Sequence, residues 1–188
     1  MVVMSGSIPQ GVETDAYKIL VKEVKNQGKK VILDTSGELL KKGIKAKPSM
    51  IKPNMDEIRM LTGRDCATKQ ELIEAAVWLY RQGIEMVVIS MGKEGALMVC
   101  ERGVYQAKVP EIDAVNTVGC GDSMVAGFAL GFERRLSMRE MLKKASAISA
   151  AAALREETGY FLREDMMKIY PEVKIDKIME MQEEQLCH

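Results

Sequence analysis

A glycine-rich turn runs into a predicted helix in the segment Asn116-Thr117-Val118-Gly119-Cys120-Gly121-Asp122-Ser123-Met124-Val125-Ala126-Gly127-Phe128. Two glycines one residue apart, Gly119 and Gly121, allow the backbone to turn tightly just before the helix begins. The first amides of a helix have no intrahelical acceptor, and the helix dipole adds positive potential beside them. The amides of residues 119–122 therefore predict an anion site that suits a phosphate group.

The same turn carries a carboxylate, Asp122, which is unfavourable for simple phosphate binding. Its presence is explained if Asp122 takes a proton from a hydroxyl while the amides stabilise the charge on a transferred phosphoryl group. The alternative is a glycine turn in which Asp122 is an ordinary helix N-cap. The segment alone leaves both interpretations open.

Strands alternate with helices along the rest of the chain. Apolar runs predict strands at residues 2–4, 31–33, 50–51 and 86–90. Helical periodicity predicts helices at residues 14–28, 38–45, 56–61, 69–81, 118–132 and 138–156. We expect a β-hairpin at residues 96–100 and 105–109, and an edge strand at residues 173–178. This order predicts an α/β fold with a doubly wound, mostly parallel sheet and a β-hairpin.

Composition excludes several classes of protein. The chain has 188 residues, 47% of them hydrophobic and 29% charged, which argues against intrinsic disorder. Its net charge of zero disfavours general nucleic-acid binding, which needs a basic surplus. No apolar run approaches the roughly 18 residues of a membrane span, and the N-terminus lacks the basic region of a secretory signal. We therefore expect a cytoplasmic protein with no nucleic-acid or membrane partner.

The cysteines and the histidine limit the available chemistry. Cys66, Cys100, Cys120 and Cys187 form no CxxC pair, and the single histidine is the final residue, His188. A structural zinc site needs clustered Cys and His, and hydrolysis by a Ser-His-Asp or Cys-His set needs a positioned histidine. The remaining candidates for chemistry are carboxylates, backbone amides, lysine or a bound ion.

Two common nucleotide motifs are absent. A Walker loop needs GxxxxGK[ST], and no Gly-Lys pair followed by Ser or Thr occurs in the chain. A Rossmann fingerprint needs GxGxxG directly after the first strand, but Gly119 and Gly121 lie late in the sequence and Met124 stands at the third glycine position.

The segment 116–128 resembles the second signature of the ribokinase-like sugar kinases, the phosphofructokinase B family, whose usual core is Gly-Ala-Gly-Asp. Four further segments resemble family elements in the family's order: 5–11, 34–37, 52–57 and 90–95. Asn116 and Ser123 favour the branch that contains 1-phosphofructokinase and tagatose-6-phosphate kinase. The resemblance implies ATP-dependent phosphoryl transfer to a phosphorylated ketohexose, first of all fructose 1-phosphate. Tagatose-6-phosphate kinase, a nucleotide-binding module without catalysis and, more remotely, a dinucleotide oxidoreductase are the alternatives.

The resemblance also assigns roles at the glycine turn. Asp122 corresponds to the catalytic base, and Gly119, Cys120 and Gly121 supply amides for the γ-phosphoryl group. Cys120 replaces the usual alanine, and a thiol at a helix N-terminus is expected to be stabilised as a thiolate.

Other family positions would bind the nucleotide and its ions. Asn54 and Glu57 would organise Mg²⁺, through water, and Lys52 would approach the ATP phosphates. A solvated carboxylate at Glu57 and an ordinary surface lysine at Lys52 are the alternatives. The remaining candidates are the nucleotide-lining Ser90, Gly92 and Gly95, the adenine contact Ser149, and the monovalent-cation (K⁺) oxygens of Asn116 and Val118. The structural alternative for Ser90, Gly92 and Gly95 is a simple turn at the end of a strand, and for Ser149 it is a serine that only packs in the helix.

Family members carry a large part ahead of the segment that resembles residues 5–7, with the lid strands and most sugar contacts. We therefore expect residues 1–188 to be the C-terminal, ATP-binding portion of a ribokinase-like kinase domain, without the N-terminal part and lid. Such a chain should not be a working kinase alone, and it should self-associate through the open edge at residues 2–4.

Overall fold

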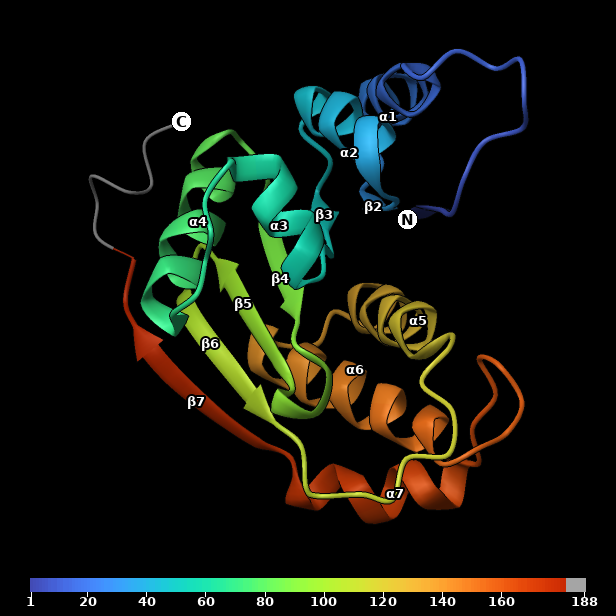
Figure 1. The fold of residues 1–188 in the computed structure, drawn as a ribbon, viewed down its shortest axis with the longest axis vertical. Coiled ribbons are helices and arrows are strands. Elements are labelled where there is room, and N and C mark those ends of the chain that lie inside the picture. The colour runs from blue at the N-terminus through green and yellow to red at the C-terminus, as the bar shows by residue number, and fades with distance from the viewer. Residues whose placement is uncertain (182–188) are drawn as a thin grey trace. The chain divides into compact units, whose positions relative to one another are not determined.

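The computed structural model describes residues 1–181, which divide into two compact units (Figure 1). The first unit contains Met1–Ser90, Met98–Val104 and the described residues from Met179 onward. The second unit contains Met91–Leu97 and Tyr105–Ile178. Seven strands form one mixed sheet in which neighbours follow chain order, from β1 to β7.

The elements agree closely with the sequence prediction. The strands are β1 (Val2–Ser5), β2 (Val31–Asp34), β3 (Met50–Ile51), β4 (Met86–Ser90), β5 (Ala96–Cys100), β6 (Gly103–Lys108) and β7 (Lys174–Met179). The α-helices are α1 (Ala16–Asn26), α2 (Gly37–Gly43), α3 (Met55–Thr62), α4 (Lys69–Arg81), α5 (Cys120–Glu133), α6 (Met138–Ala153) and α7 (Arg163–Glu172). Two 3₁₀ turns, η1 (Ile44–Ala46) and η2 (Gly92–Glu94), complete the described chain. None of its helices is long and apolar enough to cross a membrane.

The first unit is built on parallel strands, of which β2, β3 and β4 are buried on both faces. β1 pairs with β2, β2 with β3 and β3 with β4, all in parallel. The three apolar residues that open β2, residues 31–33, have no exposed surface, and the same holds for residues 87–89 of β4. This burial explains why these strands read as continuous apolar runs rather than as alternating patterns. Helices α1 and α2 pack on β2, and α4 packs on β4.

Helix α4 begins with a capping box. The Thr68 hydroxyl accepts the Glu71 amide, and the Glu71 carboxylate accepts the Thr68 amide at 2.8 Å. This hydrogen bond from the Thr68 amide holds the pKa of the Glu71 carboxyl below its ordinary value. Its contribution to stability is therefore present above the ordinary carboxyl pKa and is lost as the pH falls through the lowered value.

In the second unit, helices α5 and α6 pack closely because small residues face each other. A Cβ at Gly127 would lie 2.6 Å from the Cα of Ala145, so only glycine fits at this crossing. Alanines on α6 are buried along most of the helix, as its composition predicts. The packing of α5 against α6 positions the glycine turn that precedes α5.

Helix α7 was not predicted from the sequence. It buries only Ile169, and Pro171 lies inside its last turn. Apolar periodicity is therefore weak there, and proline usually ends a helix rather than occupying it. The helix is held in place by its contacts with α6.

We expect Gly127→Ala to lower the free energy of unfolding by about 1–3 kcal/mol, the usual range for overpacking a core. The added methyl group meets backbone atoms of Ala145, which cannot move without shifting α6. Gly131→Ala is the matched control, because its methyl group meets side-chain atoms of Met141, which can change rotamer. Urea denaturation of both variants tests this, and a Gly127→Ala variant as stable as the unmodified chain would contradict it.

Candidate functional site

The carboxyl ends of β2, β3 and β4 meet at one edge of the first unit. The parallel register places Leu33 beside Ile51, and Ile51 beside Val87. Beyond these pairs, Asn54 bridges to Ser90, whose amide donates to the Pro53 carbonyl at 3.1 Å. In open α/β sheets, ligands bind outside the carboxyl ends of the strands. This edge is therefore where a ligand site is expected in this unit.

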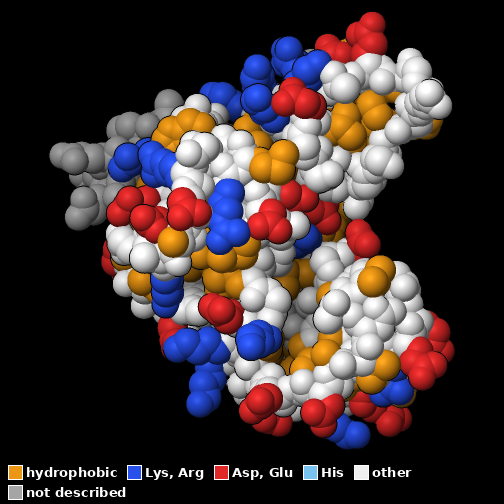
Figure 2. All heavy atoms as spheres, in the orientation of Figure 1, with side chains coloured by type: hydrophobic (Ala, Val, Ile, Leu, Met, Phe, Trp, Pro, Cys, Tyr) orange, Lys and Arg blue, Asp and Glu red, His pale blue; other side chains and the backbone are white. Residues whose placement is uncertain are grey.

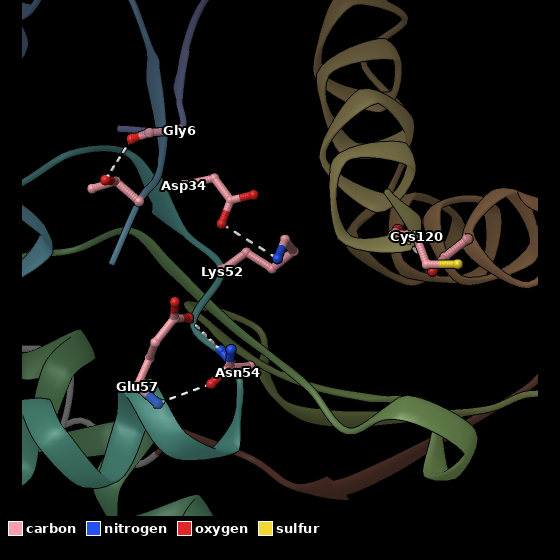
Figure 3. A network of polar contacts seen from close by, with 8 residues as sticks. Gly6, Asp34, Lys52, Asn54, Glu57 and Cys120 are labelled. Atoms are coloured by element: carbon pink, nitrogen blue, oxygen red, sulfur yellow. Dashed lines mark hydrogen bonds and ion pairs between the residues drawn. The ribbon is translucent and has the colours of Figure 1, made fainter. Parts of the chain in front are cut away.

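A buried ion pair lies at this edge (Figure 3). The Lys52 ammonium lies 3.3 Å from Asp34 Oδ1, and Lys52 is only 6% exposed. The alternative of an ordinary surface lysine at this position is therefore wrong. Desolvating two charges is costly, and replacing such a pair with apolar residues is often neutral or stabilising. The pair is thus better explained by a role for the charge of Lys52 than by stability.

Asp34 was missed as a site residue by the sequence analysis. The sequence feature that could have revealed it is its position, because its carboxylate directly follows the buried apolar run of β2. Its neighbour Thr35 donates a hydrogen bond to the Gly6 carbonyl at 2.7 Å, and the Gly6 amide donates to the Asp34 carbonyl at 3.0 Å. These bonds bring the segments around residues 6 and 34 together at the strand ends.

Asn54 and Glu57 form a capping box at the start of α3. The Asn54 side chain accepts the Glu57 amide at 2.9 Å, and the Glu57 carboxylate accepts the Asn54 amide at 2.8 Å (Figure 3). Glu57 is therefore not merely a solvated carboxylate. Within residues 1–181, no group of three or more His, Cys, Asp and Glu side chains could hold a metal ion. Two oxygen-bearing side chains suit a Mg²⁺ ion that keeps most of its waters, and this role stays a prediction.

The glycine turn of the second unit has the backbone that the sequence predicts. Gly119 is the N-cap of α5 with a φ of 80°, a conformation that favours glycine. A Cβ at this position would also lie 2.7 Å from the amide nitrogen of Gly159, so the turn requires glycine for two reasons. Asp122 is the third residue of the helix and is exposed, so the interpretation of Asp122 as the N-cap is wrong.

Two amides of the turn are available to an anion. Within the described chain, the N–H groups of Gly119 and Gly121 have no backbone acceptor, whereas the Cys120 amide donates weakly to the Thr117 carbonyl at 3.3 Å. The Asp122 carboxylate follows in the same helical turn. Donors for a phosphoryl group and an acceptor for a proton are thus adjacent.

Cys120 differs from the sequence expectation. Burial raises the pKa of its thiol, and the thiol faces the Asn116 carbonyl at 3.8 Å. The expectation of a stabilised thiolate is therefore wrong, because burial of this half-buried thiol disfavours its charged form. The Cys120 carbonyl accepts the Ser149 hydroxyl at 3.0 Å, which ties α6 to the turn. An adenine contact of Ser149 stays a prediction.

The candidate cation oxygens, those of Asn116 and Val118, lie in a turn that is held by hydrogen bonds of the Asn116 side chain. The Asn116 side chain accepts the Val118 amide at 2.9 Å and donates to the Glu156 carbonyl at 2.8 Å. Asn116 thus connects the turn to the segment after α6. Carbonyl oxygens remain the donor type for a monovalent cation, and its binding stays a prediction.

The segment after β4 is a strand-end turn. Gly92 begins η2 and Gly95 follows it, with φ values of 57° and 87°, and a Cβ at Gly95 would lie 2.0 Å from the Ala107 carbonyl oxygen. Gly95 is therefore required by the packing of β6. Roles of Ser90, Gly92 and Gly95 in nucleotide binding stay predictions.

The profile of the pfkB family of carbohydrate kinases matches residues 1–165. The chain belongs to this family. Among curated pfkB-type relatives, it is 36% identical over 178 residues to 1-phosphofructokinase of Bacillus subtilis, with 95% of this chain and 58% of the relative covered. It is 42% identical over 159 residues to 1-phosphofructokinase of Escherichia coli K12, with 85% and 51% covered. A tagatose-6-phosphate kinase of Staphylococcus epidermidis is 36% identical, with 94% and 58% covered.

Solved structures of the same family share the fold. Phosphofructokinase-2 from Escherichia coli in complex with potassium superposes with a TM-score of 0.87 at 32% identity, covering 91% of this chain and 56% of that one. Its tetrameric inhibited form gives a TM-score of 0.83 with the same coverage. The chain thus spans between half and three fifths of the length of the relatives it matches.

Proposed function

We propose that this chain provides the ATP-binding portion of a kinase that phosphorylates fructose 1-phosphate to fructose 1,6-bisphosphate. The observation that carries the proposal is the start of α5, where the amides of Gly119 and Gly121 lie beside the exposed carboxylate of Asp122. This combination suits phosphoryl transfer, which depends on positioning and charge stabilisation. The names of the B. subtilis and E. coli relatives support the choice of substrate.

In the proposed reaction, the Asp122 carboxylate accepts the proton of the sugar hydroxyl. The hydroxyl oxygen forms a bond to the γ-phosphorus while the bond from that phosphorus to the β–γ bridging oxygen breaks, and ADP leaves with the electron pair. The Gly119 and Gly121 amides stabilise negative charge on the transferred group. A bound Mg²⁺ would neutralise part of the triphosphate charge, and Asn54 and Glu57 are its proposed holders.

Lys52 is the proposed cationic contact of the ATP phosphates. Its ammonium is already positioned by Asp34 and is shielded from water, so it needs little reorganisation to meet an anion. Ser90, Gly92, Gly95 and Ser149 remain the proposed nucleotide contacts, and a monovalent cation near Asn116 and Val118 is supported by the potassium complex of phosphofructokinase-2.

Two alternatives have support of their own. A tagatose 6-phosphate substrate is supported by the relative of that name. Nucleotide binding without catalysis is supported for the 188 residues alone by their coverage of little more than half of each relative. We further propose a cytoplasmic location and self-association, the latter supported by the tetrameric form of phosphofructokinase-2.

We expect Asp122→Asn to lower turnover by about 100-fold or more, the weight of a positioned base, while ATP affinity changes by no more than a few fold. The assay measures ADP release with fructose 1-phosphate. It uses the shortest protein that contains residues 1–188 and releases ADP only when the sugar is present. Tagatose 6-phosphate run in parallel separates the two substrates. Near-normal turnover of the variant would reject Asp122 as the base.

We expect Glu57→Gln to raise the Mg²⁺ concentration needed for nucleotide binding, since it removes the proposed carboxylate partner of the ion's waters. Glu71→Gln is the matched control, because Glu71 holds the same place in the capping box of α4 and has no proposed metal role. Both variants should lose a similar, small amount of stability, because glutamine also closes a capping box. Equal Mg²⁺ dependence of the two variants would leave Glu57 with a capping role only and overturn the metal assignment.

A further inference from the structure

The outer face of α4, labelled in Figure 1, carries a cavity that the proposed function does not use. Its volume is about 320 Å³, and its lining comes from α4, from Arg64 in the preceding loop and from Met179 at the end of β7. All of these residues belong to the first unit. None of them is a candidate residue for phosphoryl transfer. The volume lies at the lower end of the range of about 300–1,000 Å³ that small-molecule sites occupy.

Helical spacing assembles the apolar part of the cavity. Ile73 and Val77 lie four positions apart on α4, so their side chains share one face of the helix, and Trp78, directly after Val77, also lines the cavity. Ile73 and Val77 are buried at 4% and 8% exposure, whereas Trp78 is 39% exposed. Trp78 is the only tryptophan of the chain. A partly exposed indole ring beside two buried aliphatic side chains provides a surface on which a flat group can stack.

The charged part of the cavity has a positive surplus. Arg64 and Arg81 are in no ion pair within residues 1–181, although Arg59 and Arg155 are each paired with an aspartate. The one carboxylate of the lining, Glu74, accepts a hydrogen bond from Gln70 at 3.1 Å. A guanidinium group presents a planar set of donors that matches a carboxylate or phosphate, and the two in this lining outnumber its one carboxylate.

We propose that this cavity binds a small anion that carries a flat ring. The phosphate or carboxylate of the ligand contacts Arg64 and Arg81, and the ring lies against Trp78 over Ile73 and Val77. This inference stands independently of the proposed kinase activity, because it uses no residue proposed for that reaction.

Phenyl phosphate is the direct probe, since it joins a flat ring to an anion. Added to the full chain, it should change the emission of Trp78 saturably, with a Kd on the order of 0.1–1 mM for a ligand of this size. Inorganic phosphate and benzyl alcohol each supply one half of the chemistry and should bind at least tenfold more weakly. Equal responses to all three, or no saturable response, would overturn the proposal.

Arg64→Gln and Arg81→Gln should each raise the Kd for phenyl phosphate about tenfold, the usual effect of losing a charged hydrogen bond. Arg139→Gln on α6 removes the same charge from an exposed site outside the cavity and should leave the Kd unchanged. The emission of Trp78 without ligand shows that each variant is folded. An unchanged Kd in both cavity variants would overturn the proposal, as would a response that depends on protein concentration, which would identify self-association.

Discussion

The left-handed backbone of Gly119 is the constraint on which the candidate site depends. A side chain there would meet both its own backbone and the amide nitrogen of Gly159, so only glycine lets α5 begin at this point. The close packing of Gly127 on Ala145 then fixes the axis of α5. Together they hold the first-turn amides and the Asp122 carboxylate in one rigid arrangement, which phosphoryl transfer requires more than any particular reactive group.

The first unit contributes a different kind of preorganisation. Parallel strands end together, so Asp34 at the end of β2 reaches the same edge as Lys52 and Asn54, which follow β3 and lie far from Asp34 in sequence. On the face shown in Figure 2, lysine and arginine side chains mix with acidic ones at the surface. The buried charge of Lys52 is the exception, since it is shielded from water and paired with a single aspartate.

Most of the fold could be predicted because buried parallel strands and amphipathic helices leave strong apolar patterns, as in β2, β4 and α4. Helix α7 could not, since it buries one apolar residue and is held by tertiary contacts. At the site, the turn at Gly119 followed from glycine spacing, whereas the Asp34–Lys52 pair and the burial that raises the pKa of Cys120 depend on contacts between distant segments. The position of Asp34 after the buried run of β2 was a signal for a site residue, but its pairing with Lys52 was not readable from the sequence.

The central claim is that the turn at Gly119–Asp122 binds the phosphates of ATP, and Cys120 reports on it directly. The measurement is the rate of alkylation of each cysteine, resolved by peptide mass spectrometry, with and without ATP and Mg²⁺. We predict that the nucleotide slows modification of the half-buried Cys120 several-fold, while the buried Cys66 and Cys100 react slowly in both conditions. An unchanged rate at Cys120 with saturating nucleotide would contradict the account.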